Sequence, residues 1–415
     1  MRVALVNYDD FSGGAGRAAN RIHHALLQCG VESRMYVNRV IRGEWTVVGP
    51  STSLINKMAR FRFPLAGLLN NTLVTNSQAY LSPAVFRSGW PKRLKESGAD
   101  VVHLHWVGAE MMSIADIGRL TGPLVWTLHD MWAFCGAEHF TEGFRWREGY
   151  TRRNRPSYES GFDLNRWTWR RKMKEWHRPM QIVAPSRWLA DCVRQSSLMR
   201  DWPVSVVPNA IDTEAYRPID RALARKLLRI PGDGPFLLFT AMGGTRDPRK
   251  GFDLLTSSLE HLRGEIEGLR LIVLGECAPA KPLNYGFPIH YTGRLNDDLI
   301  LCLYYSAADA VVTPSRQDNL PNCAVEAHAC GTPVVAFDVC GMRDIVEHET
   351  TGYLARAFDT EDLARGILWA LESAERRKML SVRSRQVAVE RFSFPVVAKQ
   401  YRDIYNQAVF AQQEN

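Results

Sequence analysis

The apolar residues of the chain form short runs that alternate with helical stretches of about 10 to 15 residues. These runs predict buried strands at residues 3–7, 101–104, 124–128, 181–184 and 204–207, and then at 236–241, 270–274, 289–292, 310–313 and 333–337. Strands that alternate with helices are typical of parallel βαβ units. The sequence therefore predicts an α/β fold with two doubly wound sheets.

The two halves of the chain begin alike, with a strand, a glycine-containing loop and a helix, at residues 3–16 and again from 236–244. Turn-forming residues at 209–218 follow a strand, so we expect a domain boundary there. This gives an N-terminal domain at 1–210 and a C-terminal domain at 211–394. Ligands of open parallel sheets bind beyond the carboxyl ends of the strands. Two such edges that face each other would make a binding cleft.

Two acids stand close together before the strand at 333–337. Asp318 is followed by seven residues and then by Glu326. A helix predicted at 321–330 puts Asp318 in a strand-to-helix loop and Glu326 within the first two turns. The free N–H groups of a helix N-terminus, with about half a positive charge, suit a phosphate, and carboxylates suit sugar or ribose hydroxyls. The pattern predicts a nucleotide-sugar site.

This stretch resembles the donor site of retaining glycosyltransferases of family 4, which have the GT-B fold. Their signature is an acid, seven residues and a glutamate, followed by Ala-x-Ala-x-Gly-x-Pro-Val-Val-Ala. Here Glu326 precedes Ala327-His328-Ala329-Cys330-Gly331-Thr332-Pro333-Val334-Val335-Ala336. A second motif, Arg249-Lys250-Gly251-Phe252-Asp253, opens a helix after the strand at 236–241. The resemblance covers nearly the whole chain and implies two Rossmann-like domains facing a central cleft, with residues 395–415 forming a helix that crosses back to the N-terminal domain.

The resemblance assigns Lys250 to the donor diphosphate, and we assign Asp318 to the sugar and Glu326 to the ribose. The alternatives are a solvated lysine at 250, a helix N-cap at 318 and an exposed helix surface at 326. Relatives often carry an arginine six residues before the lysine, where this chain has Gly244. The remaining expected donor contacts are Arg246 or Arg249 in place of that arginine, the amides of Asn319 and Leu320 with Asn322 beside Pro321, and backbone near Gly275 and Arg294 for the base.

In the N-terminal half, His129 follows a strand in Thr127-Leu128-His129-Asp130-Met131-Trp132. A histidine at this place in relatives hydrogen-bonds the donor sugar, and we expect Asp130 to orient its ring. His103 and His105 lie on a similar edge, one facing inward and one outward, and a structural role is as well supported as a functional one.

Gly13 and Gly14 are expected to let the backbone approach the donor phosphate or the acceptor. Gly14, Gly16 and Ala19 also fit the dinucleotide fingerprint, although the acid that should follow about 20 residues later is absent. Arg39 would suit a 2′-phosphate, so an NADP-dependent oxidoreductase remains an alternative.

Composition adds a cellular setting. The chain has 415 residues, enough for two domains, and its eight cysteines include no Cys-x-x-Cys pair, which favours buried thiols in a reducing compartment. It shows no signal-peptide pattern and no uncharged apolar run of about 18 residues. We expect a cytoplasmic protein, peripheral at the inner face of the cytoplasmic membrane if it binds lipid.

The formal net charge of +8 is concentrated in an insertion at residues 145–178. This segment holds eleven Lys or Arg and four acids, a net +7, interleaved with seven Trp, Tyr and Phe residues. It would suit an anionic membrane surface or a lipid-diphosphate-linked acceptor, or it would pack as a charged flap on the first domain. No nucleic acid, metal ion or other cofactor is expected.

We therefore expect a retaining hexosyltransferase that moves a sugar from a UDP- or GDP-sugar to a glycan hydroxyl, lipid-linked, in the synthesis of an exopolysaccharide, O-antigen or capsule. The alternatives are a nucleotide-sugar epimerase of the same architecture, the NADP-dependent oxidoreductase and a catalytically silent binding module.

Overall fold

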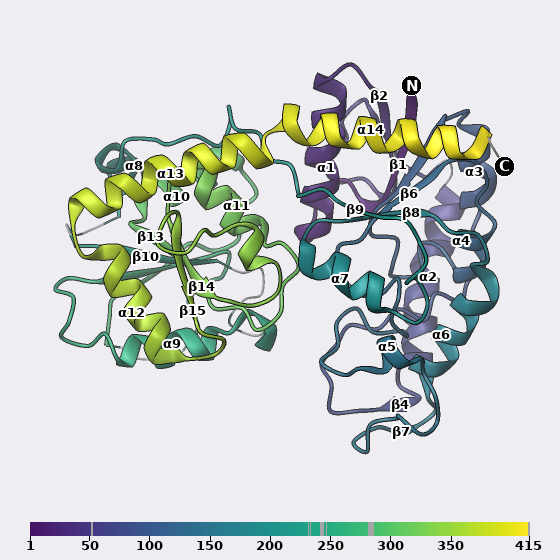
Figure 1. Cartoon of the computed structure of the whole chain (residues 1–415), viewed down its shortest axis with the longest axis horizontal. Helices are drawn as coiled ribbons and strands as arrows, with labels where there is room; N and C mark the ends of the chain where they lie inside the picture. The colour runs from purple at the N-terminus through teal and green to yellow at the C-terminus, as the bar shows by residue number, and fades with distance from the viewer. Residues whose placement is uncertain are drawn as a thin grey trace. The chain divides into compact units, whose positions relative to one another are not determined.

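The computed structural model describes residues 1–50, 53–230, 232, 234–240, 245, 247–280 and 286–413, with the backbone alone for 53–60, 63 and 413. The chain divides into two compact units (Figure 1). The first comprises Met1–Val207 with Val397–Asn415, and the second comprises Pro208–Val396. Each unit is built around one parallel sheet, which confirms the predicted α/β class.

The first unit contains a seven-stranded sheet in the order β3-β2-β1-β5-β6-β8-β9, with every pair parallel. Its strands are β1 Arg2–Asp9, β2 Glu32–Arg39, β3 Val47–Val48, β5 Val101–Leu104, β6 Leu124–Thr127, β8 Gln181–Ala184 and β9 Val204–Val206. The helices are α1 Gly13–Gln28, α2 Ser53–Asn70, α3 Trp90–Glu96, α4 Ile114–Gly118, α5 Arg145–Glu148, α6 Leu164–Glu175, α7 Arg187–Gln195 and most of α14 Phe394–Gln413. β4 Leu73–Val74 and β7 Ser160–Gly161 form a separate antiparallel pair.

The second unit contains a six-stranded parallel sheet in the order β12-β11-β10-β13-β14-β15. Its strands are β10 Phe236–Thr240, β11 Arg270–Leu274, β12 Ile289–Tyr291, β13 Ala310–Thr313, β14 Val334–Phe337 and β15 Gly352–Ala355. The helices are α8 Arg221–Leu228, α9 Phe252–Glu260, α10 Asp298–Ala307, α11 Asn322–Ala329, α12 Thr360–Leu371 and α13 Ala374–Phe392, with short 3₁₀ turns η1 Pro248–Lys250 and η2 Cys340–Asp344.

The strands of the second unit are mostly apolar because both faces of the sheet are covered; the exceptions are Thr240, Arg270, His290 and Thr313. Successive residues of β10 point to opposite faces, so Phe236 and Leu238 join one core cluster while Leu237 and Phe239 join the other. In Figure 1, α8, α10, α11 and α13 lie on one side of this sheet and α9 and α12 lie on the other. The ten strands predicted from the sequence are found, with ends shifted by one or two residues.

The C-terminal helix α14 belongs to the first unit from Val397 onward. Its buried Tyr405 and Tyr401 hydroxyls form hydrogen bonds with His103 Nδ1 (2.7 Å) and Thr127 Oγ1 (2.9 Å) on β5 and β6. Two tyrosines one helical turn apart thus tie the end of the chain to the first sheet.

All eight cysteines are free thiols, as predicted, but only Cys135, Cys192, Cys302 and Cys330 are buried; Cys277 is exposed and the other three are half-buried. Across the described residues, we find no helix with the length and apolar character that a membrane crossing requires.

Candidate functional site

The loop between β13 and α11 carries Asp318 and leads into the helix that carries Glu326. Pro321 occupies the N-cap position of α11, with φ −64° and no side-chain capping bond. The suggestion that Asp318 is only the cap of this helix is therefore wrong. Its carboxylate is directed to another loop.

Lys250 ends η1, and its Nζ forms an ion pair with Asp318 Oδ2. Gly251 explains how the two loops come so close: its φ is +66°, and a Cβ there would lie 1.9 Å from the carbonyl oxygen of Pro314. The Arg316 amide also donates to the Arg249 carbonyl at 2.7 Å. Glycine is required at this contact, and the contact places the lysine beside the acid.

The Lys250 side chain is 26% exposed and that of Asp318 is 15% exposed, so the proposed solvated lysine is wrong. Burial lowers the pKa of Lys250, but the Asp318 carboxylate beside it outweighs burial and keeps that pKa above its ordinary value. The ammonium is therefore charged at neutral pH, with three N–H donors to share between Asp318 and a bound anion.

Glu326 faces inward from α11 and is only 4% exposed, which rules out an exposed helix surface. The hydroxyl of Tyr305, on α10, donates to Glu326 Oε2 at 2.7 Å. Burial, and then the neighbouring Glu326 charge, raise the pKa of Tyr305 well above its usual value, so the tyrosine remains a donor. This bond fixes the orientation of the carboxylate.

The segment after Asp318 is held by a residue that the sequence analysis placed only at the domain boundary. Asn209 Nδ2 donates to the Leu320 carbonyl (3.3 Å) and to Asn322 Oδ1 (3.0 Å). Asn319 is buried, and Leu320 packs in the core of the unit. The role of Asn209 was missed because its partners lie more than a hundred residues later in the chain. No local sequence pattern indicates a contact over such a separation.

The other residues expected to contact the donor lie in different surroundings. Arg249 is not free to replace the missing arginine, because Asp247 engages its Nη2 at 2.7 Å and its Nε at 3.2 Å. Arg246 lies outside the described residues. Gly275 has φ +95° and donates its N–H to Thr292 Oγ1 at 3.1 Å, while Arg294 is exposed in the loop after β12.

In the first unit, His129 follows β6, and its Nε2 lies 2.9 Å from His105 Nδ1. The prediction that Asp130 orients His129 is wrong: Asp130 Oδ2 instead accepts from Trp106 Nε1 at 2.9 Å and contacts His139 Nδ1 at 2.6 Å. The turn after His129 directs the carboxylate to this neighbouring histidine, which the sequence analysis overlooked.

His103 and His105 were expected to face opposite ways, and this is also wrong. Both rings are buried, with centroids 4.2 Å apart. β5 ends at Leu104, so the alternation of a strand does not extend to His105.

The glycine loop after β1 is occupied by a carboxylate. Asp9 Oδ1 accepts from the amides of Phe11 (3.1 Å) and Ser12 (2.7 Å), and it lies 2.7 Å from where a Gly16 Cβ would stand. Gly13, at φ +68°, starts α1, and Gly14 follows it. A dinucleotide pyrophosphate would meet this negative charge, so the loop does not favour the NADP alternative.

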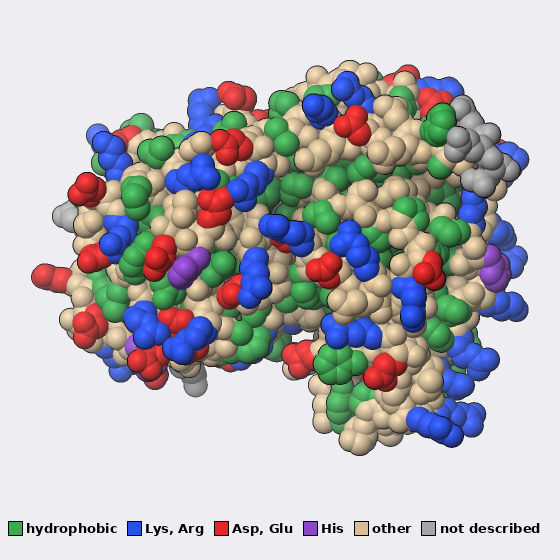
Figure 2. Space-filling model, viewed as in Figure 1, with side chains coloured by type: hydrophobic (Ala, Val, Ile, Leu, Met, Phe, Trp, Pro, Cys, Tyr) green, Lys and Arg blue, Asp and Glu red, His purple; other side chains and the backbone are tan. Residues whose placement is uncertain are grey.

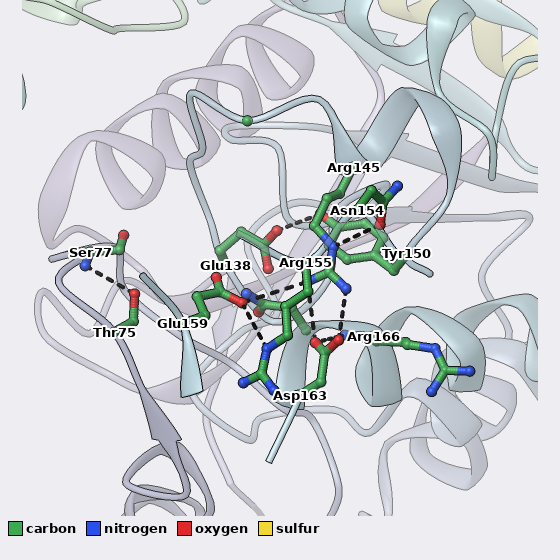
Figure 3. Close-up of polar contacts among 12 residues, drawn as sticks. Thr75, Ser77, Glu138, Arg145, Tyr150, Asn154, Arg155, Glu159, Asp163 and Arg166 are labelled. Atoms are coloured by element: carbon green, nitrogen blue, oxygen red, sulfur yellow. Dashed lines mark hydrogen bonds and ion pairs between the residues drawn. The ribbon is translucent and has the colours of Figure 1, made fainter. Parts of the chain in front are cut away.

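Two of the four acids of the insertion at 145–178, Glu159 and Asp163, form ion pairs within it (Figure 3). Arg145 pairs with Asp163 at 2.7 Å and with Glu159 at 3.6 Å, and Arg155 lies 3.7 Å from Glu159. Lys172 is fully buried, and its Nζ donates to the carbonyls of Trp132, Cys135 (3.1 Å) and Gly136 (2.7 Å). Part of the basic segment therefore packs on the first unit, as one of the alternatives predicted.

Replacing Lys172 with methionine should lower the free energy of unfolding by about 3–5 kcal/mol, because three carbonyls that Lys172 now bonds would lose their donor. Denaturation in urea followed by tryptophan fluorescence measures this change, since every tryptophan except Trp369 lies in the first unit. Lys174→Met is the control, because Lys174 is exposed on the same helix. Equal stability of the two variants would contradict the structural role of Lys172.

The buried histidines predict acid sensitivity of the first unit. Burial lowers the pKa of His103 to about 3, that of His129 to about 4, and that of His105 well below its ordinary value. In the unfolded chain the same histidines have pKa values of about 6.5, so below that pH the unfolded state binds more protons than the folded state. The stability that the neutral histidines contribute is therefore fully present above about pH 6.5 and is lost as the pH falls toward about 4.

Between pH 6.5 and 4.5 we expect the thermal midpoint, followed by tryptophan fluorescence, to fall by about 10 °C or more. His103→Asn should flatten this dependence, and His177→Gln, at an exposed position, should not. A midpoint that stays constant over this range would show that these rings are not held neutral.

Comparison with known proteins gives matches to both units. The family model described as Glycosyl transferases group 1 matches residues 220–387, and that described as Glycosyltransferase Family 4 matches residues 12–215. A curated relative, D-inositol 3-phosphate glycosyltransferase of Xylanimonas cellulosilytica, is 32% identical over 251 residues, which are 55% of this chain and 58% of that protein. The chain thus spans less than two thirds of the length of this relative.

Two solved structures are similar over almost the full length. Sucrose-phosphate synthase from Thermosynechococcus elongatus has a TM-score of 0.67 at 18% identity, covering 99% of this chain and 100% of that one. Anabaena HepE, solved in complex with UDP-glucose, has a TM-score of 0.66 at 16% identity, covering 98% and 100%. At these identities the likeness concerns the fold.

Proposed function

Because the chain belongs to glycosyltransferase family 4, we propose that it transfers a sugar from a nucleoside diphosphate sugar to a hydroxyl group, with retention of anomeric configuration. Its fold is the GT-B fold of its structural neighbours, with two Rossmann-like domains. The ion pair between Lys250 and Asp318, beside the N-terminus of α11, carries the proposal most directly.

Lys250 is the group proposed to receive the donor diphosphate. Breaking the anomeric bond leaves negative charge on the leaving nucleoside diphosphate, and a fixed ammonium stabilises that charge as it develops. Asp318 holds the ammonium in place before the donor arrives. Once the phosphate shares the ammonium, the carboxylate is available to accept a hydroxyl of the sugar.

Glu326 is proposed to bind the ribose through its two hydroxyls, because a carboxylate accepts two vicinal hydroxyls and Tyr305 already fixes one oxygen. UDP is the first donor to test, since a structural neighbour was solved with UDP-glucose, and GDP is the second. We assign His129 to the donor sugar from the resemblance alone. No nucleophile is assigned to the chain.

The acceptor is proposed to be a glycan linked to a lipid diphosphate, made for a surface polysaccharide at the inner face of the cytoplasmic membrane. The exposed cations of the segment at 145–178 support an anionic acceptor. Independence of a metal ion remains a prediction, and EDTA in the assay described next tests it.

The test is to incubate the protein with UDP-, GDP- and ADP-sugars and a lipid extract, and to measure both the glycosylated lipid and the released nucleoside diphosphate. Transfer with release supports the proposal. An isomerised sugar without transfer would identify an epimerase, a tightly bound NADP an oxidoreductase, and an unchanged donor with every extract would leave only a binding role.

A further inference from the structure

The eleven basic side chains of the insertion fall into three groups. Four are used inside the first unit, through acids, carbonyls or both: Arg145, Arg155, Arg171 and Lys172. Three lie elsewhere on the surface: Arg147, Lys174 and Arg178. The remaining four, Arg152, Arg153, Arg166 and Arg170, line one hollow together with Tyr150, Thr151 and Trp169. Figure 2 shows Lys and Arg side chains gathered on the surface of this unit around α6.

The hollow has a volume of about 500 Å³, which is within the range of small-molecule sites. Its four guanidinium groups form no hydrogen bond or ion pair with any residue that the structure describes. No acid among the described residues lines the hollow. Of the acids in the insertion, Glu159 and Asp163 are engaged by Arg145 and Arg155, and Glu148 accepts from Asn154 Nδ2 at 3.1 Å. The positive charge of the hollow is therefore uncompensated.

Arg166 makes this charge costly to the free protein. It is half-buried, its Nε has no hydrogen-bond partner among the described residues, and its side chain extends away from the Arg145–Asp163 pair (Figure 3). A cation withdrawn from water without a partner destabilises the fold, and an anion beside it would recover that cost. The rim cations Arg152, Arg153 and Arg170 are exposed and can move toward the same anion.

A hollow in the second unit provides a contrast. It measures about 570 Å³ and is also lined by basic residues, among them Arg221 and Arg225. Those two pair with the buried Asp309, at 2.9 Å and 2.6 Å. Much of the positive charge of this second hollow is neutralised within the protein, so the structure gives less reason to place an anionic ligand there.

We propose that the hollow lined by Arg152, Arg153, Arg166 and Arg170 is a binding site for a phosphate group, with the Trp169 ring beside it to pack against the portion that carries the phosphate. Guanidinium groups bind phosphate oxygens through paired N–H donors. This site uses no residue of the donor site. That the phosphate belongs to the sugar acceptor is a further step, which rests on the proposed function.

Calorimetric titration with inorganic phosphate and pyrophosphate tests the site in the full chain. The measurements use the Lys250→Ala background, which removes the proposed phosphate ligand of the donor site. We expect pyrophosphate to bind, and Arg166→Gln with Arg170→Gln to weaken it by about 10- to 100-fold. Arg152→Gln with Arg153→Gln, at the exposed rim, should weaken it as well, and this pair avoids the half-buried Arg166.

Arg147→Gln with Arg178→Gln is the matched control, because it removes the same charge from the same insertion outside the hollow. Absence of pyrophosphate binding, unchanged affinity in both hollow variants, or an equal loss in the control would overturn the proposal. Calorimetry measures binding and does not depend on turnover. A failure of the phosphate-site proposal can therefore be distinguished from a failure of the proposed function.

Vesicles distinguish the two sources of the phosphate. If the phosphate is a lipid headgroup, the protein should sediment with phosphatidylglycerol vesicles and should not sediment with phosphatidylcholine vesicles. The variant with Arg152→Gln and Arg153→Gln should no longer sediment with phosphatidylglycerol vesicles. If it is the phosphate of a soluble or acceptor-borne group, pyrophosphate should bind in the calorimeter while the rim substitutions leave sedimentation unchanged. Either pattern supports the site.

Discussion

Lys250→Ala should lower the turnover number by about 100- to 1,000-fold, the loss that follows removal of one fixed group that stabilises transition-state charge. The ammonium is held by Asp318 and is charged at neutral pH, so it meets the departing diphosphate without rearrangement. Initial rates of nucleoside diphosphate release with saturating donor measure the effect.

Lys378→Ala is the matched control, because Lys378 is exposed on α13 in the same unit. Its rate should equal that of the wild type. Lys250→Arg should recover part of the activity, since the charge is kept while its position shifts. Wild-type turnover in Lys250→Ala would remove this residue from the chemical step.

Glu326→Gln should raise the Michaelis constant for the donor by about 10- to 100-fold while changing turnover much less, because the ribose is held equally before and during the reaction. Glutamine is close to the same size, and its carbonyl oxygen can still accept from Tyr305, so the helix should keep its place. Steady-state kinetics over a range of donor concentrations measures both constants.

A 2′-deoxyribose donor makes the assignment specific. Wild-type enzyme should bind this analogue much more weakly than the natural donor, and Glu326→Gln should distinguish the two far less. Tyr305→Phe should produce a smaller effect in the same direction, since it releases the carboxylate without removing it. If Glu326→Gln loses the same affinity for both donors, the ribose does not lie at this carboxylate.

Most of the fold was predictable from the sequence, because fully covered parallel strands such as β13 and β14 consist almost entirely of apolar residues. The acid pair was selected as a candidate by its spacing, and the lysine by the family resemblance; their roles remain predictions. The contact that brings Lys250 to Asp318 was not evident, because it depends on Gly251 fitting against the Pro314 carbonyl sixty-odd residues later.

Side-chain partners were the least predictable part of the site. Asp130 stands next to His129 in the sequence, yet it pairs with His139. Arg249 stands next to Lys250, yet it pairs with Asp247. Asn209, assigned to the boundary, holds Leu320 and Asn322. In each case loop geometry decides the partner, and neighbouring residues in the sequence point in different directions.

The most direct test of the account is a crystal structure of the protein with UDP, GDP or an intact donor sugar bound. We expect the diphosphate at the Lys250 ammonium near the N-terminus of α11, and the ribose hydroxyls at Glu326. A nucleotide bound elsewhere, with Lys250 still paired only to Asp318 and Glu326 bonded only within the protein, would contradict the account.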